Sequence, residues 1–322
     1  MKFILKLKKG VLKLFDTIRL KAEDIHIEEE KMIKIEDTKT TTYYIKDTGE
    51  LNTQYQIKTE KLPYITYFSS SKRLIIQVSI PKFLFGENVS IIKPKDIIVF
   101  WDKLQKEIFQ LLGVKISKVE WIVQRIDICW NFNVGNKVSD YIQYLGKKKL
   151  PYKQTHLINH SETVIFKNKS SCIMFYDKQR ECEVRKQTVA LTEKAFGILR
   201  MEIRPPLNAI RAYSSERKAV EILTLDFFKL NYEKVIKDIS FEELNLQTTN
   251  ISFEWLGQYK INRVETMLGF CIIKNSIGVS KTKEIYGSTY YARNKWIEEI
   301  GLPQTTALPS LLIEWLDFQE NE

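Results

Sequence analysis

The chain has 322 residues, which suits one large domain or two ordinary ones, and its hydrophobic fraction of 44% is enough for a core. Its 50 Lys and Arg against 40 Asp and Glu leave a formal charge of +10, which favours nucleic acid as a partner; a generally lysine-rich surface is the alternative. No apolar run reaches the about 18 residues that span a bilayer, and the four cysteines form no C-x-x-C pair. The composition therefore argues against a membrane protein, a thiolate zinc site and a dithiol redox enzyme.

Residues 1–14 are expected to form a basic extension before the fold. Lysines interrupt their apolar residues every few positions, so no signal-peptide core is present. A basic amphipathic helix on DNA or on a membrane surface is the alternative. From residue 15 onward, Thr, Tyr and Ile alternate with polar residues, which predicts successive strands. These strands are FDTIRLKAE, TTYYIKD, TQYQIKTE, PYITYFSS and RLIIQVSI, with a turn at Asp47-Thr48-Gly49.

A helix and further strands follow. Pro81 takes the chain out of the sheet and Gly86 marks a turn. An apolar stripe at helical spacing predicts a helix over Asp96 to Leu112 that ends at Gly113. The remaining elements up to residue 206 are the long strand VEWIVQRIDICWNF, a short helix from Ser139 or Asp140 to Leu145, a hairpin of ETVIFKN and SCIMFYDK, and the strand ILRMEIRP.

The pattern of apolar residues changes near residue 207, where helical spacing replaces the alternation of apolar and polar residues. We therefore divide the chain into the extension, a domain over residues 15–206 and a helical region over residues 207–322. The predicted fold class is α+β, with an antiparallel sheet flanked by helices and followed by a smaller helical C-terminal region.

A helix-turn-helix pattern lies in the helical region. Lys281 to Ile285 reads as a short helix, Gly287 as a turn, and Ser288 as the N-cap of a helix over Thr289 to Ile300. Helix–glycine–helix also occurs in ordinary bundles, so a DNA-reading helix and a packing helix both remain open. The side chains that the second helix would present to DNA are Tyr290, Arg293, Asn294 and Lys295.

Two carboxylates interrupt otherwise apolar strands. Side chains alternate between the faces of a strand, so Asp127 shares a face with Arg125 in RIDICWNF. Glu202 likewise shares a face with Arg200 and Arg204 in ILRMEIRP. A carboxylate inside a strand is costly to bury unless it is paired or binds a metal ion, so a salt bridge to one of these arginines is the alternative. Carboxylate oxygens select hard cations, which makes Mg²⁺ or Mn²⁺ the expected ion.

A tyrosine at the end of a third strand is the candidate nucleophile. Tyr176 is expected to share a face with Lys178. The phenol of tyrosine has an ordinary pKa of about 10, and the Lys178 ammonium would favour its ionised, nucleophilic form. Glu181 is either a further metal ligand or the partner of Lys178. If the three strands lie side by side, two carboxylates, a phenol and an ammonium meet on one surface, a set suited to metal-assisted chemistry on a phosphate.

In order and spacing, several segments resemble the filamentous-phage gene II/X type of replication-associated protein. They are FDTIRLK, SIPKFLFGEN, VQRIDICWNF, ETVIFKNKSSCIMFYDKQRE and LRMEIR. A more distant similarity is to the plasmid rolling-circle Rep initiators, which share a Y-(D/N)-K-x-x-E element. The resemblance covers about residues 15 to 205, and the helix-turn-helix pattern extends it toward residue 303.

The resemblance implies rolling-circle replication started by a strand-specific nick at an origin in the cytoplasm of a bacterial host. Tyr176 would attack the phosphodiester, keep the 5′-phosphate and leave a 3′-hydroxyl for a host polymerase. Asp127 and Glu202 would hold the metal ion. Single- and double-stranded origin DNA is the implied partner, with host replication proteins as possible further partners. The arginines expected to contact the DNA are Arg125, Arg200 and Arg204.

Other residues and other functions remain open at this point. Tyr141 and Tyr144 compete as nucleophiles but also fit one packed side of a helix, and Tyr291 is suited, like Tyr290, to stacking on bases. The histidines are few: His26, and the pair His156 and His160, which lack the His-apolar-His spacing of many nicking enzymes. The alternative functions are a metal-dependent nuclease that uses water and a non-catalytic helix-turn-helix regulator.

Overall fold

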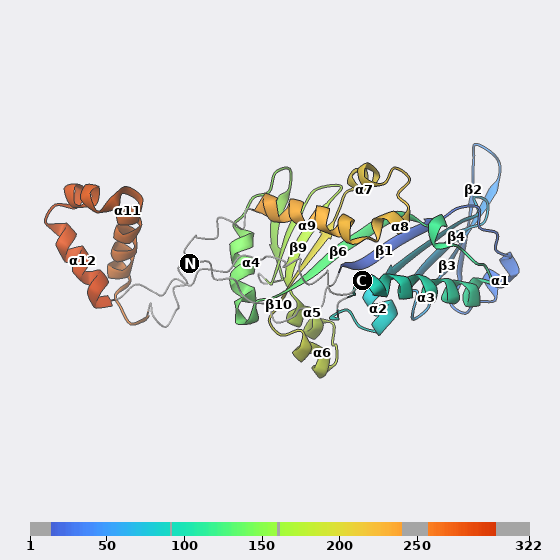
Figure 1. Ribbon diagram of the computed structural model, residues 1–322, viewed down its shortest axis with the longest axis horizontal. Coiled ribbons are helices and arrows are strands. Elements are labelled where there is room, and N and C mark those ends of the chain that lie inside the picture. The colour runs from blue at the N-terminus through green and yellow to red at the C-terminus, as the bar shows by residue number, and fades with distance from the viewer. Residues whose placement is uncertain (1–13, 91, 160–161, 240–256, 301–322) are drawn as a thin grey trace. The chain divides into compact units, whose positions relative to one another are not determined.

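The computed structural model describes residues 14–90, 92–159, 162–239 and 257–300 (Figure 1). The chain divides into two compact units, of which the first holds the described residues up to 239 and the second those from 257 to 300. The sheet belongs to the first unit, and the second unit is helical.

Ten strands of the described chain form one sheet in the order β2-β3-β4-β5-β1-β6-β10-β9-β8-β7. Every neighbouring pair is antiparallel, so the predicted α+β class and antiparallel sheet are confirmed. The strands are β1 (Phe15–Ala22), β2 (Lys39–Tyr44), β3 (Leu51–Ile57), β4 (Tyr64–Phe68), β5 (Arg73–Ser79), β6 (Ile122–Asn133), β7 (Gln154–Ile158), β8 (Thr163–Lys167), β9 (Cys172–Asp177) and β10 (Ile198–Arg204).

Helices lie between groups of strands in the chain and flank the sheet (Figure 1). In the first unit they are α1 (Glu29–Ile33), α2 (Ile80–Phe85), α3 (Pro94–Leu112), α4 (Val138–Gly146), α5 (Lys178–Val184), α6 (Val189–Lys194), α7 (Leu207–Tyr213), α8 (Ala219–Ile222) and α9 (Leu225–Ile239). The second unit contains α11 (Ile261–Tyr286) and α12 (Thr289–Ile300).

Helix α3 illustrates how local sequence sets these elements. Pro94 occupies the first turn, and the backbone N–H of Lys93 donates to Asp96 Oδ2 at 2.6 Å, which satisfies a donor at the helix start. Its apolar stripe is buried, and Gly113 ends the helix with a left-handed φ of 73°, a conformation that glycine adopts without strain. The helix predicted from the stripe is therefore confirmed.

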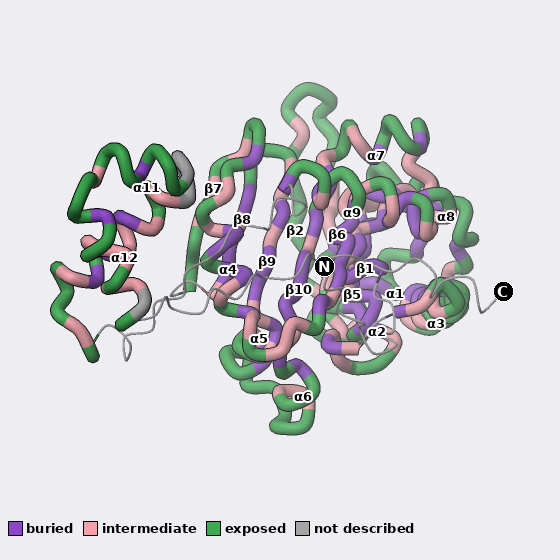
Figure 2. Tube along the Cα trace, turned by 60° about the vertical axis from the view of Figure 1, so that its left-hand side comes forward, coloured by how far each residue is buried: buried purple, intermediate pink, exposed green. Residues whose placement is uncertain are grey.

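The central strands have one apolar and one polar face. Ile126, Ile128 and Trp130 of β6 are buried on the apolar face, and the Trp130 ring lies 5.6 Å from the ring of Phe228 on α9. Helix α9 therefore covers the apolar face. Figure 2 shows burial running through β1, β6, β10 and β9. Partly exposed side chains such as that of Arg125 alternate with the buried ones and form the polar face.

The first unit extends beyond the boundary that the sequence suggested at residue 206. The Ala219 N–H at the start of α8 donates to the Trp121 carbonyl at 2.9 Å, and α9 packs on β6 through Phe228. All described residues of α7, α8 and α9 belong to the same compact unit as the sheet. Helices α7 to α9 thus complete the core of the sheet unit rather than starting a separate region.

In the second unit, the short helix expected over Lys281 to Ile285 is wrong, because these residues are the last part of the 26-residue α11. The turn at Gly287 and the following helix, α12, are as predicted. Phe270 packs edge-on against Tyr286 and Tyr290, with centroids 5.2 and 5.5 Å away, so an aromatic cluster holds the two helices together. A DNA-binding helix-turn-helix remains a prediction.

Candidate active site

The polar face of three adjacent strands, β6, β10 and β9, brings the predicted site residues together. Arg200 lies directly opposite Tyr176, and Glu202 lies opposite Cys129 on one side and Met174 on the other. Directly opposite residues share a face, so Tyr176 and Glu202 project from the same side of the sheet. The Tyr176 hydroxyl donates a hydrogen bond to Glu202 Oε1 at 2.6 Å.

Asp127 joins this face but is held by two arginines. Arg125 Nε donates to Asp127 Oδ1 at 3.0 Å, and Arg204 Nε donates to the same oxygen at 2.9 Å. Both arginines also donate to Oδ2 through a second nitrogen. The Asp127 side chain is 6% exposed, whereas those of Arg125 and Arg204 are 32% and 44% exposed. The salt-bridge alternative for Asp127 is therefore what the structure contains.

A third carboxylate, which the sequence reasoning missed, belongs to the same face. Ser79 Oγ donates to Asp16 Oδ1 at 2.8 Å, and Asp16 is buried. Strict alternation places Asp16 beside Ile18 on the apolar face. The pairing of β1 with β6 shifts between Phe15 and Ile18, and this irregularity turns Asp16 to the polar side. An aspartate at the second position of the first strand was the only signal in the sequence.

Burial dominates the electrostatics of the tyrosine–glutamate pair. It raises the pKa of Tyr176 well above its ordinary value, and the Arg200 charge opposes this rise. Burial also raises the pKa of Glu202, with the nearby Asp16 charge acting in the same direction. A carboxylate with a raised pKa is a stronger base than an ordinary one, so Glu202 is suited to accept the Tyr176 proton.

Lys178 is not on the strand face where the sequence placed it. Strand β9 ends at Asp177, whose side chain accepts the Arg180 N–H at 3.1 Å and caps α5. Lys178 therefore begins a helix, is fully buried, and donates to Asn88 Oδ1 at 3.0 Å and to Glu181. Glu181 also forms an ion pair with Arg185. Its carboxylate is therefore occupied by Lys178 and Arg185 and does not join Asp127 and Glu202.

Arg200 is also placed differently from the prediction. It is fully buried, with Nε donating to Asn131 Oδ1 at 2.9 Å and Nη2 donating to the Asn88 carbonyl. A direct contact with DNA is therefore wrong for this arrangement, whereas Arg125 and Arg204 retain exposed surface. Asn88 contacts both buried cations, Lys178 and Arg200, through different oxygens.

Glu87 organises the loop that carries Asn88. Burial alone would raise the pKa of Glu87, but hydrogen bonds from Ser90, Lys194 and Val89 lower it to about 2. The carboxylate thus stabilises the fold above its unfolded pKa of about 4.3, and this contribution is lost as the pH falls toward the folded value. We expect Glu87→Gln to lower the free energy of unfolding by about 1 kcal/mol at neutral pH, after allowance for solvent screening, and by less near pH 3.

Urea unfolding at both pH values measures this difference. Glu60→Gln is the matched control, because Glu60 is exposed. An equal loss at both pH values for Glu87→Gln would contradict the assigned role.

The predicted metal ligands do not fit a divalent ion in this arrangement. Both oxygens of Asp127 accept from guanidinium groups, Glu202 accepts from Tyr176, and Glu181 lies beside Lys178. Within the described residues, no group of three or more His, Cys, Asp or Glu is placed to hold a metal ion. His26 bonds to a backbone carbonyl, and His160 lies outside the described residues. A requirement for Mg²⁺ or Mn²⁺ stays a prediction.

Tyr290, in the second unit, is 6% exposed and packs against Phe270, so its ring is not free to stack on a base as expected. Asn294 accepts from Lys274 Nζ at 2.7 Å, and the Arg293 guanidinium lies over the ring of Tyr286. More accessible side chains of α12 are those of Lys295, 73% exposed, and Tyr291. In the first unit, the rival tyrosines Tyr141 and Tyr144 are both buried in α4.

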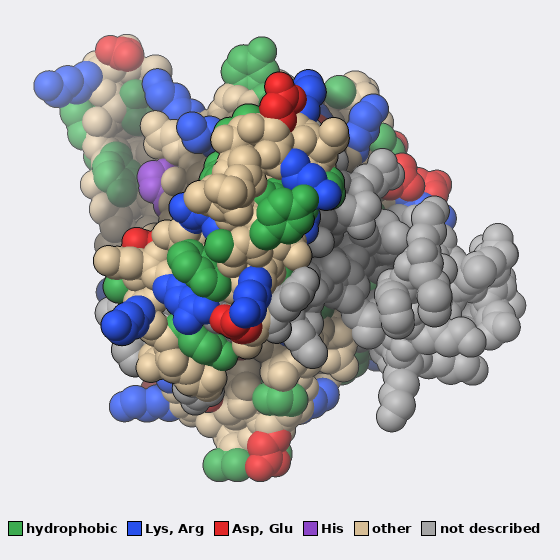
Figure 3. Space-filling view, turned by 90° about the vertical axis from the view of Figure 1, so that its left-hand side faces the viewer, with side chains coloured by type: hydrophobic (Ala, Val, Ile, Leu, Met, Phe, Trp, Pro, Cys, Tyr) green, Lys and Arg blue, Asp and Glu red, His purple; other side chains and the backbone are tan. Residues whose placement is uncertain are grey.

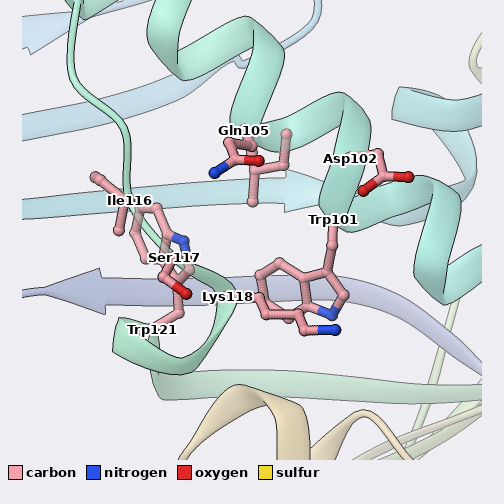
Figure 4. Close-up of a pocket in the computed structure, with 8 residues that line it drawn as sticks. Trp101, Asp102, Gln105, Ile116, Ser117, Lys118 and Trp121 are labelled. Atoms are coloured by element: carbon pink, nitrogen blue, oxygen red, sulfur yellow. The ribbon is translucent and has the colours of Figure 1, made fainter.

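On the face that Figure 3 shows, Lys and Arg side chains lie at several separate places among hydrophobic and uncharged groups. A cavity of about 230 Å³ lies between α3 and the segment that precedes β6 (Figure 4). Its lining includes the indole rings of Trp101 and Trp121 and the side chains of Gln105 and Lys118. None of its lining residues belongs to β6, β9 or β10, so it is separate from the tyrosine–glutamate pair.

Comparison with known families identifies the chain. The family model for the N-terminal part of the gene II type of phage replication-associated protein matches residues 7–251, which include every strand of the sheet. The chain belongs to this phage replication-associated protein family. Membership confirms the predicted resemblance and indicates a replication initiator, for which DNA is the natural partner. A comparison with curated proteins returned no match. Among the described helices, none is long and apolar enough to cross a membrane.

Proposed function

We propose that this member of the gene II family is a rolling-circle replication initiator that nicks and rejoins one DNA strand through a covalent phosphotyrosine at Tyr176. The observation that carries the proposal is the 2.6 Å hydrogen bond from the Tyr176 hydroxyl to Glu202, a carboxylate with a raised pKa. A tyrosine needs a base to act as a nucleophile at neutral pH, and Glu202 is already within proton-transfer distance.

The proposed step balances as a transesterification. Glu202 Oε1 takes the proton from Tyr176 Oη, and the resulting phenolate oxygen attacks phosphorus in line with the leaving group. A bond forms between Oη and phosphorus while the bond from phosphorus to the 3′-oxygen breaks. The 3′-oxygen takes up a proton and becomes the free hydroxyl, and the 5′-phosphate stays on Tyr176. Because the new ester bond replaces the old one, the reverse reaction can rejoin the strand.

Arg125 and Arg204 are the groups best placed to hold the phosphate. Two guanidiniums share the single charge of Asp127, so the three side chains carry a net charge of +1. Both arginines reach the surface of the polar face, and charge-assisted hydrogen bonds to phosphate oxygens are the contacts that guanidinium groups form best. Arg19, directly opposite Arg125 on β1, extends the positive charge across the sheet.

Tyr176 is 8% exposed, so attack on DNA needs a local displacement of its neighbours. Met174 on the same strand and Ile165 opposite it are only partly buried on this face. Their side chains can move without opening the core, since they lie on the face opposite α9. We expect the DNA strand to displace them as it binds.

The Mg²⁺ or Mn²⁺ requirement is part of the proposal only as the expectation that the family resemblance implies. A divalent ion would supply charge neutralisation at the scissile phosphate. Activity with a single-stranded origin oligonucleotide in chelator, compared with activity in Mg²⁺ or Mn²⁺, tests it independently of the tyrosine.

Mapping the covalent adduct tests the proposed nucleophile. We expect the wild-type protein to form a protease-sensitive adduct with an origin oligonucleotide, with the phosphate on Tyr176 by peptide mass, and Tyr176→Phe to form none. Tyr152→Phe is the matched control, because Tyr152 is 95% exposed and lies outside the three strands of the site. Cleavage without any adduct would support a water-dependent nuclease, and binding without cleavage would support the regulator instead.

A further inference from the structure

Arg200 is a buried charge beside the proposed nucleophile. It lies directly opposite Tyr176 in the pairing of β10 with β9, and side chains at such positions stand about 5 Å apart at Cβ. None of its surface is exposed. It is therefore too deep to contact DNA, yet it is adjacent to the atoms that the proposed reaction changes.

The hydrogen-bond partners of Arg200 are neutral. Nε donates to the Asn131 side-chain amide and Nη2 to the Asn88 backbone carbonyl, while the buried Nη1 has no acceptor among the described residues. Among the residues that the structure describes, no carboxylate oxygen lies within salt-bridge distance, 4.0 Å, of the Arg200 guanidinium. An arginine stays charged even when it is buried, so this charge is costly and only partly satisfied.

Lys178 shows that a buried cation in the same region can be neutralised by a carboxylate. This second buried cation also contacts Asn88, and Glu181 neutralises it. Of these two cations, only Arg200 has a buried N–H without an acceptor and lacks a paired carboxylate in the described structure. The arrangement leaves a fixed positive charge where a negative charge would be stabilised, as in preorganised sites that favour a developing anion.

We propose that Arg200 is a positioning residue whose fixed charge stabilises the negative charge that forms on the Tyr176 oxygen when its proton passes to Glu202. The inference rests on the proposed function, because it requires Tyr176 to be the nucleophile. Proton transfer moves one negative charge from the Glu202 carboxylate to the phenolate. The Arg200 charge acts on both groups, but it lies directly opposite Tyr176 and acts more strongly on Tyr176 than on Glu202, so it lowers the cost of that move. The Arg200 charge opposes the effect of burial on the pKa of Tyr176, in agreement with this role.

A purely structural role is the competing explanation, since Arg200 also ties β10 to the loop at Asn88. The two explanations differ in their effect on the ionisation of the phenol at position 176. If Arg200 stabilises the phenolate, removal of its charge raises the pKa of this phenol, and lysine restores it. If Arg200 only holds the fold, variants that fold leave the pKa of the phenol unchanged.

The test combines Arg200→Met and Arg200→Lys with tyrosine or 3-fluorotyrosine at position 176, the latter having the more acidic phenol. The rate of adduct formation with an origin oligonucleotide is the measurement, and urea unfolding checks that each variant is folded. We expect Arg200→Met to slow adduct formation at least about tenfold, which corresponds to one pKa unit, and Arg200→Lys to restore most of the rate. With 3-fluorotyrosine at position 176, whose ionisation is followed by ¹⁹F NMR, the pKa of the phenol should rise by at least about one unit in Arg200→Met and return most of the way in Arg200→Lys.

Arg211→Met is the matched control for loss of one positive charge, because Arg211 is exposed on α7. An unchanged pKa of the phenol in a folded Arg200→Met variant, or no rescue by lysine, would overturn the inference while leaving the proposed function intact. An unchanged rate in Arg200→Met would overturn it as well. If the wild-type protein forms no adduct at Tyr176, the proposed function fails, and the inference fails with it.

Discussion

Glu202→Gln is expected to lower the rate of adduct formation by about 10²- to 10⁴-fold, the usual contribution of a general base. The amide keeps the shape of the side chain and can still accept the Tyr176 hydrogen bond, but it cannot take the proton. Binding of the origin oligonucleotide should change little, because Arg125 and Arg204 remain. The measurement is the single-turnover rate of adduct formation at saturating DNA.

The pH dependence of the wild-type rate checks the same assignment. Burial and then the Asp16 charge raise the pKa of Glu202, so the rate should rise with pH through a value above that of an ordinary glutamate. Glu202→Asp should keep part of the rate and the rise of the rate with pH on the acid side of the profile. Glu202→Gln should lose this rise. Glu193→Gln, an exposed change on α6, is the control. Recovery of Glu202→Gln at high Mn²⁺ would instead favour a metal-ligand role.

Asp127→Asn has the largest expected effect on stability. It removes the negative charge shared by Arg125 and Arg204 while leaving both guanidiniums in place. Breaking a buried ion pair costs about 3–5 kcal/mol. Here both arginines reach water, so we expect a loss of about 2–3 kcal/mol in the free energy of unfolding, measured by urea titration.

The same substitution should strengthen DNA binding and steepen its salt dependence, because one negative charge leaves the polar face. A metal-ligand role for Asp127 predicts the opposite pattern, with cleavage abolished and affinity unchanged. Asp102→Asn on α3 is a suitable control, because Asp102 lines the separate cavity and takes no part in the site. Weaker binding in Asp127→Asn would contradict the arginine pairing described here.

The alternation of side chains was sufficient to place some of these groups and insufficient for others. Asp127 and Glu202 occupy the face that alternation assigns them, because β6 and β10 are regular over these residues. Lys178 does not, because a capping aspartate starts α5 one residue earlier than the strand pattern implies. Asp16 was missed because a shift in strand register reverses the rule locally. The alternation of side chains along a strand therefore fails to predict the face of a residue next to a helix cap or a shift in strand register.

The burial of Arg200 could not be read from its own strand. The arginines at positions 200 and 204 share a face, yet one is fully buried and the other is 44% exposed. The difference comes from the loop at Asn88, which is 112 residues away in the sequence. The inclusion of α9 in the sheet unit likewise depends on a contact between distant segments, that of Phe228 with Trp130, which periodicity does not report.

The strand order also sets when the site can exist during synthesis. β10 inserts between β6 and β9, and so it separates two strands that are made before it. Glu202 arrives on this last strand, so a nascent chain released before residue 204 lacks the partner of Tyr176. Pairing across such long sequence separations slows folding, and the late insertion delays assembly of the reactive pair until β10 has been synthesised.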